Sequence, residues 1–128
     1  MRYLLDTHLI LWAAGDFERL PRTVQDLIED SDNDIAFSVG SLWEIAIKSG
    51  QGRSDFVVDA SELRQSLLDN NFQELPVFAE HALAVEALPM LHKDPFDRLL
   101  LAQSIIEGFV LLTSDKILSR YPGPVRAI

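Results

Sequence analysis

Short apolar runs alternate with longer amphipathic stretches along the whole chain. Such short runs suit strands buried on both faces, and they occupy residues 2–6, 34–38, 72–77, 109–114 and 124–128. Between them, apolar residues recur at helical spacing within residues 8–16, 20–34, 41–50, 59–70, 79–89 and 94–108. This alternation predicts an α/β fold with a central parallel sheet of four to five strands flanked by helices. At 128 residues, the chain is expected to form a single domain over residues 1–128.

Residues with capping chemistry mark where several of these helices should start. Thr7 can cap the helix after the first strand, and Ser38 can cap the helix after the second strand. Asp94 precedes a proline, which is favoured at the first helical position, so we expect Asp94 to be an N-cap. Asp97 then falls at the third helical position, where its carboxylate can bond back to the amide of the cap residue. Residues 50–56, which contain two glycines and several polar residues, predict a loop.

Four acidic residues from distant parts of the sequence are expected at one edge of the sheet. Asp6 and Asp115 directly follow strands, and open α/β sheets bind ligands at the carboxyl ends of their strands. Glu44 lies in the second turn of a helix entered from a strand end, and Asp97 lies in the first turn of a helix that starts at the same edge. These carboxylates would repel one another unless a cation lay among them. Because Mg²⁺ and Mn²⁺ prefer oxygen ligands, the pattern predicts a site for one of these ions.

Composition and charge narrow the class of protein. The formal net charge of −9 argues against nucleic acid, because polyanion binding is largely neutralisation of phosphates by Lys and Arg. Residues 93–128, however, carry five basic residues against four acidic ones, so this region becomes effectively positive if a cation neutralises some of the acids. The absence of cysteine excludes a disulfide framework and thiolate metal sites. No apolar run approaches the ~20 residues of a membrane span, and polar residues interrupt the apolar N-terminus, so we expect a cytoplasmic protein.

Four ordered motifs, taken together, resemble a known family. The motif "LLDTH" follows a short strand, "SLWEIAIK" places an acid in a helix, "DPFDRLLLAQ" opens a later helix and "LLTSDK" closes a strand. This combination extends over essentially the whole chain and resembles the PIN-domain ribonucleases. The sequences "WEIAIK" and "HKDPFDRLLLAQ" are similar to those of the VapC-type toxins of bacterial toxin–antitoxin pairs.

The resemblance implies an endoribonuclease that cleaves RNA with Mg²⁺ or Mn²⁺. It implies that the acidic quartet of the family falls on Asp6, Glu44, Asp97 and Asp115. It also implies a homodimer and a cognate antitoxin that blocks the site. In the mechanism that we expect, Asp6, Asp97 and Asp115 hold the cation, while Glu44 positions or deprotonates the attacking water.

Four residues beside the acids have both a functional and a structural interpretation. Thr7 and Ser114 can hydrogen-bond a carboxylate or a metal-bound water of the site, but both positions also suit capping residues. Arg98 and Lys116, each one residue after a predicted ligand, can contact a substrate phosphate or lie in solvent. The sequence alone leaves these alternatives open.

The histidines and tryptophans are expected to be mainly structural. His8, His81 and His92 show no ligand spacing, although His8 and His92 lie near enough to the predicted site to touch substrate. Trp12 and Trp43 occur within apolar stripes, so we expect them to pack in the core or in a subunit interface.

Other classes of protein share parts of this pattern. Receiver domains of response regulators need two acids after the first strand beside the phosphoacceptor, but Asp6 stands alone there. Haloacid-dehalogenase-type phosphatases need a second Asp two residues later, where this chain has His8. A catalytically silent module of the same fold that only binds a partner is a further alternative.

Glu44, taken singly, also has a structural interpretation, because it could pair with Lys48 on an exposed helix face.

Overall fold

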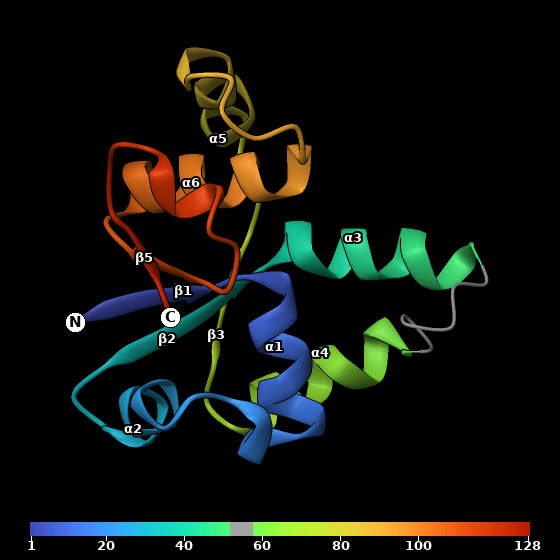
Figure 1. The fold of residues 1–128 in the computed structure, drawn as a ribbon. Coiled ribbons are helices and arrows are strands. Elements are labelled where there is room, and N and C mark those ends of the chain that lie inside the picture. Colours follow the sequence, from blue (N-terminus) through green and yellow to red (C-terminus); the bar gives the residue numbers. More distant parts are fainter. Residues whose placement is uncertain (52–57) are drawn as a thin grey trace.

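Five parallel strands form one sheet at the centre of the molecule (Figure 1). The computed structural model describes residues 1–51 and 58–128, so most of the loop predicted at 50–56 lies outside the described residues. The strands run in the spatial order β3-β2-β1-β4-β5, and their bounds are β1 (Arg2–Leu5), β2 (Asp34–Ser38), β3 (Gln73–Leu75), β4 (Val110–Thr113) and β5 (Val125–Ala127). The predicted α/β fold with a parallel sheet is thus confirmed, with five strands.

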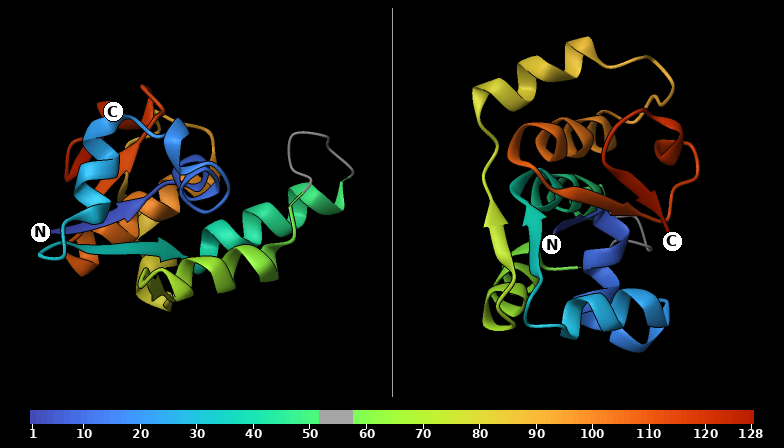
Figure 2. Two further views of the ribbon diagram at one scale, coloured as in Figure 1. Left: turned by 90° about the horizontal axis from the view of Figure 1, so that it is seen from below. Right: turned by 90° about the vertical axis from the view of Figure 1, so that its left-hand side faces the viewer.

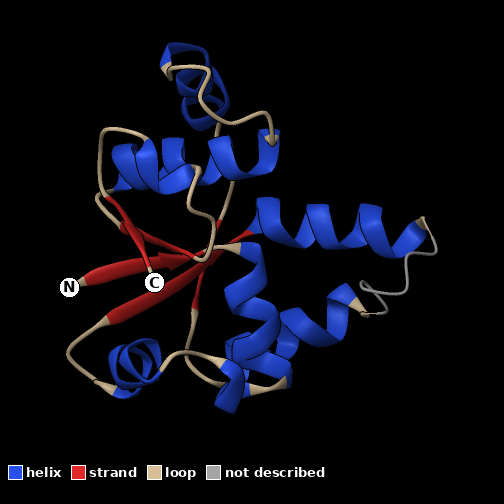
Figure 3. Ribbon diagram, in the orientation of Figure 1, coloured by secondary structure: helices blue, strands red, loops and turns tan. Residues whose placement is uncertain are grey.

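Helices cover both faces of the sheet, as Figures 1 and 3 show. The α-helices are α1 (Thr7–Gly15), α2 (Arg22–Glu29), α3 (Val39–Gly50), α4 (Ala60–Asp69), α5 (Ala79–Ala84) and α6 (Pro95–Glu107). Short 3₁₀ turns are η1 (Phe17–Arg19), η3 (Val85–Ala87) and η4 (Leu118–Arg120). In Figure 1, α5 and α6 lie above the sheet, whereas α1, α2 and α4 lie below it. None of the helices in the described part of the chain combines the length and apolar character needed to cross a bilayer.

The core consists of two apolar clusters, one on each face of the sheet. Side chains alternate along a strand, so Tyr3 and Leu5 of β1 face one cluster while Leu4 faces the other. The first cluster joins the sheet to α1, α2 and α4, and the second joins it to α6. Fully burying a leucine side chain stabilises a fold by about 1.5–3 kcal/mol. Burial on both faces explains why the inner strands read as unbroken apolar runs in the sequence.

Two of the predicted helix caps are confirmed. The Asp94 carboxylate accepts hydrogen bonds from the amides of Phe96 at 2.9 Å and Asp97 at 3.3 Å, which starts α6. The Ser38 hydroxyl accepts from the amide of Gly40 at 2.9 Å, which starts α3. Each side chain satisfies amides that have no partner within the first turn of the helix. The two caps fix where α3 and α6 begin relative to the strand ends.

The predicted cap of α1 is wrong by one residue. Asp6, and not Thr7, is the N-cap, because the Asp6 carboxylate accepts from the amide of Leu9 at 2.9 Å. Asp6 keeps an extended backbone directly after β1, whereas Thr7 is already helical. The hydroxyl of Thr7 is therefore free to point across to α3.

The strand order reverses at β1, between β2 on one side and β4 on the other. The chain passes from β1 to β2 and β3 on one side of the sheet, and then crosses to β4 and β5 on the other side. Such a reversal of strand order opens a crevice at the carboxyl ends of the two strands that flank it, here β1 and β4. Asp6 directly follows β1, and Asp115 lies two residues after β4. The topology thus accounts for the proximity of two acids that are far apart in the sequence.

The two tryptophans have different environments. Trp12 of α1 is half-buried and packs against the first apolar cluster, as expected. Trp43 of α3 is 61% exposed, so of its two expected places the core is excluded, and the subunit interface stays a prediction. Its ring packs edge-on against Phe96, with ring centroids 5.3 Å apart. Figures 1 and 2 show that α3, which carries Trp43, extends away from the sheet.

Candidate functional site

Asp6 is held rigidly at the carboxyl end of β1. One carboxylate oxygen accepts from the amide of Leu9. The other accepts from the hydroxyl of Thr113 at 2.7 Å and from the amide of Ser114 at 3.1 Å. Asp6 is only 3% exposed, and burial raises its pKa, although these hydrogen bonds partly offset the effect. The structure therefore fixes this carboxylate in a site with little access to water.

Glu44 lies in the second turn of α3 and is also buried, at 4% exposed. Its Oε1 accepts from the Thr7 hydroxyl at 2.7 Å, and the Thr7 oxygen lies 3.0 Å from the Ser41 hydroxyl oxygen. Its Oε2 lies 2.6 Å from Nζ of Lys48. The ion pair considered from the sequence does form, but on a buried side of the helix rather than an exposed one. Glu44 is thus tied to both α1 and its own helix.

Asp97 connects the acids on the two sides of the site. It lies in the first turn of α6, and its pKa is raised to about 7 by burial and then by the negative charges of Asp94, Asp6 and Glu44. A raised pKa of this kind is expected where several carboxylates share one site without a compensating cation. The structure therefore brings Asp97 within electrostatic reach of two other predicted acids.

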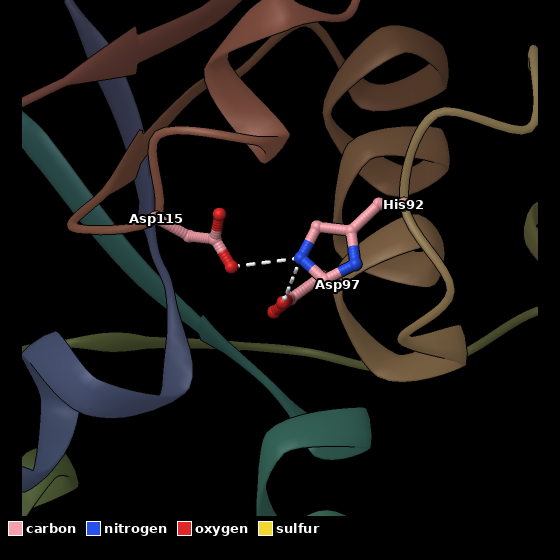
Figure 4. A group of neighbouring side chains, drawn as sticks. All are labelled: His92, Asp97 and Asp115. Atoms are coloured by element: carbon pink, nitrogen blue, oxygen red, sulfur yellow. Dashed lines mark hydrogen bonds and ion pairs between the residues drawn. The ribbon is translucent and has the colours of Figure 1, made fainter.

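Asp115 joins the site through His92. Nε2 of His92 lies 2.7 Å from Oδ2 of Asp115 and 3.3 Å from Oδ2 of Asp97. Figure 4 shows both carboxylates facing the same ring nitrogen. One ligand atom from each of these three residues can be chosen such that all lie within 4.8 Å of one another. Within residues 1–51 and 58–128, this group is the one with the spacing of a metal site.

The other oxygen of Asp115 holds the turn after β4. Its Oδ1 accepts from the amides of Ile117 at 2.8 Å and Leu118 at 3.2 Å. Burial alone would raise the pKa of Asp115, but the hydrogen bonds from His92 and these amides outweigh burial and lower it. Asp115 is consequently the acid of the site that ionises most readily among those with a shifted pKa.

The predicted return bond from Asp97 to the cap of α6 does not form. The amide of Asp94 donates instead to Nδ1 of His92 at 3.0 Å. The Asp97 carboxylate is turned towards Nε2 of the same ring. The His92 ring thus lies between the helix cap and the acids, close to the site as expected, but with partners that the sequence does not predict.

The four flanking residues fall into different environments. Thr7 contacts Glu44 through its hydroxyl, whereas Ser114 contacts Asp6 through its backbone amide. Arg98 turns away from the acids, and its guanidinium donates to the carbonyls of Val85 and Leu88, each at 3.2 Å. Lys116 is exposed directly after Asp115.

Thr113 is a contact that the sequence did not identify, whereas His92 was expected near the site but not as a partner of its carboxylates. Thr113 is a buried strand residue, and its position before the predicted acid was the only signal available. His92 lies in an irregular segment whose placement depends on Tyr121, because the Tyr121 hydroxyl accepts from the amides of Leu91 and His92. Both residues donate or can donate to carboxylates of the site.

The donor set fits a hard divalent cation. Its members are carboxylate oxygens from the ends of β1 and β4 and from the starts of α3 and α6. Asp97 supports this fit, because its pKa is raised first by burial and then by the neighbouring negative charges of Asp94, Asp6 and Glu44. A cation placed among these carboxylates would relieve their mutual repulsion.

Comparison with known proteins agrees with this arrangement. The PIN domain family model matches residues 3–124. Ribonuclease VapC22 of Mycobacterium tuberculosis is 30% identical over 125 residues, which cover 95% of each chain.

Solved structures support the same fold. VapBC2 from Rickettsia felis, bound to a DNA fragment from its promoter, matches with a TM-score of 0.70 at 18% identity, over 100% of this chain and 99% of that one. VapBC-5 of the toxin–antitoxin systems of Mycobacterium tuberculosis matches with a TM-score of 0.62 at 18% identity, over 99% and 97% of the two chains. The chain belongs to the PIN domain family, as a relative of the VapC proteins.

Proposed function

We propose that this chain is a metal-dependent endoribonuclease that hydrolyses RNA phosphodiesters and serves as the toxin of a toxin–antitoxin pair. In this proposal residues 1–128 form a single PIN-like nuclease domain that acts in the cytoplasm with Mg²⁺ or Mn²⁺. The similarity to a protein named a ribonuclease supports RNA as the substrate. The absence of cysteine is consistent with a site built from oxygen ligands.

One observation carries the proposal. Asp97 lies within electrostatic reach of Asp6 and Glu44 and within one 4.8 Å group with Asp115 and His92. Two of the four predicted acids thus share one group with His92, and the charges of the other two act on Asp97, at the edge where the strand order reverses. Acids placed this way cost stability unless a cation lies among them, so their convergence favours a functional cation site over chance.

Each acid has a role that follows from its surroundings. A bound divalent cation would polarise the scissile phosphodiester and lower the pKa of the attacking water. Asp6, Asp97 and Asp115 are assigned to hold that cation, and the three hydrogen bonds to Asp6 keep its carboxylate oriented. Glu44 is assigned to position the attacking water and accept its proton.

Among the described residues, two lysines lie beside predicted acids of the site. Lys48 Nζ lies 2.6 Å from Glu44 and offsets part of the local negative charge. Lys116 is exposed beside Asp115, so its ammonium group can reach a substrate phosphate. Arg98, in contrast, is engaged by backbone carbonyls of the segment before α6, so we assign it a structural role.

A cognate antitoxin and a second copy of the chain are the proposed protein partners. The structures similar to this chain include VapBC toxin–antitoxin complexes, which supports an antitoxin partner. Exposed Trp43 and Ile47 on α3 are suited to a subunit contact. Light scattering on the purified chain, alone and after addition of the antitoxin, measures both assemblies.

A silent binding module of the same fold is the alternative that requires an experiment. Purified, antitoxin-free protein is incubated with cellular RNA in the presence of Mg²⁺, Mn²⁺ or EDTA, beside Asp6→Asn. We expect cleavage with either ion and none with EDTA, and a loss of cleavage in Asp6→Asn. Thermal melts of both proteins show whether the variant is folded.

The outcomes separate the two functions. Equal cleavage with EDTA and with Mg²⁺, or full activity of folded Asp6→Asn, would contradict the proposed nuclease. No cleavage under any condition by protein that still binds an antitoxin would favour the silent module.

A further inference from the structure

His92 lies where a metal ligand would be expected. Its Nε2 is 2.7 Å from a carboxylate oxygen of Asp115 and 3.3 Å from one of Asp97. Imidazole is also a common ligand for divalent metals. Distance alone would therefore assign His92 to the metal, together with the two acids (Figure 4).

The hydrogen bond at the other ring nitrogen argues against that assignment. The backbone amide of Asp94 is a donor only, and it points at Nδ1 of His92 from 3.0 Å. Nδ1 must therefore be the acceptor, without a proton of its own. In the neutral ring the single N–H then lies on Nε2, which faces the carboxylates of Asp115 and Asp97.

A ligand needs a free lone pair on the nitrogen that faces the metal. Binding a metal through Nε2 would move the ring proton to Nδ1, where it would meet the amide proton of Asp94 at hydrogen-bond distance. The backbone that carries the ring is held beside that amide by the Tyr121 hydroxyl, which accepts from the amides of Leu91 at 3.1 Å and His92 at 2.9 Å. The His92 side chain is also only 13% exposed.

We propose that His92 is a positioning residue, which donates Nε2–H to the carboxylates of Asp115 and Asp97, and is not a ligand of the metal. This inference rests on the proposed function, because it concerns the same site. Asp115 is then held at both oxygens, by the amides of Ile117 and Leu118 on one side and by His92 on the other. His92 thereby sets how the free lone pairs of Asp115 are directed.

The position of the ring proton can be observed directly in the metal-free protein. Long-range ¹H–¹⁵N NMR spectra of protein with labelled histidine distinguish a protonated Nε2 from a protonated Nδ1. The signal of His92 is assigned by its absence in His92→Gln. We expect a protonated Nε2 and an unprotonated Nδ1; a protonated Nδ1 on a neutral His92 ring would overturn the proposal.

Metal binding gives the second readout. Gln offers an N–H near the position of Nε2 but no ring nitrogen, whereas Leu offers no donor. We expect Mn²⁺ affinity, measured by electron paramagnetic resonance, to stay close to wild type in His92→Gln and to fall about 10–100-fold in His92→Leu, the usual effect of losing a group that orients a ligand. Equal losses in both variants, or no loss in His92→Leu, would overturn the proposal.

Pulsed electron paramagnetic resonance of the Mn²⁺ complex shows directly whether a nitrogen atom is bound to the metal. We expect no strongly coupled nitrogen in wild type. A directly bound nitrogen that disappears in His92→Gln would contradict the positioning role. All three measurements are made without RNA, so their results do not depend on whether the protein cleaves RNA.

Discussion

The hydroxyl of Thr7 donates a 2.7 Å hydrogen bond to Oε1 of Glu44, which joins the first turn of α1 to the second turn of α3. Both residues are buried, at 3% and 4% exposed. α1 begins at the end of β1 and α3 begins at the end of β2. This contact therefore holds Glu44 of α3 against the end of β1. The orientation of Glu44 therefore depends on the uncharged Thr7 of another helix as well as on Lys48 of its own helix.

Replacement of Thr7 by Val removes the hydroxyl and keeps the shape of the side chain. We expect Thr7→Val to lower the free energy of unfolding by about 1–3 kcal/mol, because a buried carboxylate oxygen loses its partner. RNA cleavage should also fall, because Glu44 is no longer held. Thr7→Ser keeps the hydroxyl and serves as the control in urea denaturation and cleavage assays. Equal stability and activity in both variants would show that the hydrogen bond has no such role.

The raised pKa of Asp97 predicts a dependence of stability on pH in the metal-free protein. A carboxyl group whose folded-state pKa lies above its ordinary value of 3.8 costs stability as pH rises from that value, and the cost is complete above about 7. A difference of one between the folded-state and unfolded-state pKa corresponds to about 1.4 kcal/mol of stability. Asp97→Asn removes the ionisation and therefore the cost.

We expect Asp97→Asn in EDTA to be more stable than wild type at about pH 8, with a smaller advantage at about pH 5, because ionisation of Asp97 in the folded state is incomplete at the lower pH. Urea denaturation at the two pH values measures the difference. Mg²⁺ should reverse the order at the higher pH by stabilising wild type more than the variant. The same advantage at both pH values would contradict the assigned pKa.

Asp94 stabilises the start of α6 by its hydrogen bonds and affects the pKa of Asp97 by its charge. Asp94→Ala loses the bonds to the amides of Phe96 and Asp97, so we expect it to cost about 0.5–2 kcal/mol of stability. Asp94→Asn keeps a capping oxygen and should cost less. Because the Asp94 charge is the second cause of the raised pKa of Asp97, Asp94→Asn should also lower that pKa, which NMR titration of the labelled carboxyl group can measure. An unchanged Asp97 pKa in Asp94→Asn would contradict the electrostatic assignment.

Substitutions of Arg98 and Lys116 should have different effects on stability and on RNA cleavage, although the sequence suggests the same two roles for both residues. Arg98→Met removes two hydrogen bonds to the carbonyls of Val85 and Leu88, and we expect it to cost about 1–3 kcal/mol of stability while folded molecules still cleave RNA. Lys116→Met changes an exposed side chain, so we expect stability within about 0.5 kcal/mol of wild type and weaker cleavage. Weaker cleavage by Arg98→Met at unchanged stability, with a loss of stability in Lys116→Met, would instead indicate that Arg98 contacts the substrate.

The sequence predicted the fold well because the inner strands are buried on both faces. Unbroken apolar runs such as that of residues 109–114 have few other uses in a chain of this composition. The acids at strand ends followed from topology alone, and Asp94 was recognisable as a cap because a proline follows it. These signals are local, or depend only on the order of elements.

The remaining features depend on contacts that the sequence does not encode locally. The cap of α1 was assigned to Thr7 because both Asp and Thr have capping chemistry, and only the backbone after β1 decides between them. The placement of His92 depends on a tyrosine hydroxyl 29 residues later. The direction of the long Arg98 side chain likewise depends on the path of the segment before α6.

The central claim is that the four converging acids form one metal-dependent nuclease site. The most direct test compares initial rates of RNA cleavage by wild type, Asp97→Asn and Asp26→Asn at saturating Mg²⁺, with thermal melts on the same samples. Asp26 is an exposed acid of α2 that pairs with Arg22, so it controls for the loss of one negative charge. We predict wild-type cleavage by Asp26→Asn and a loss of at least about 100-fold in folded Asp97→Asn, a minimum for removing a group that stabilises the transition state electrostatically. Cleavage by folded Asp97→Asn at the wild-type rate would contradict the assignment of this site.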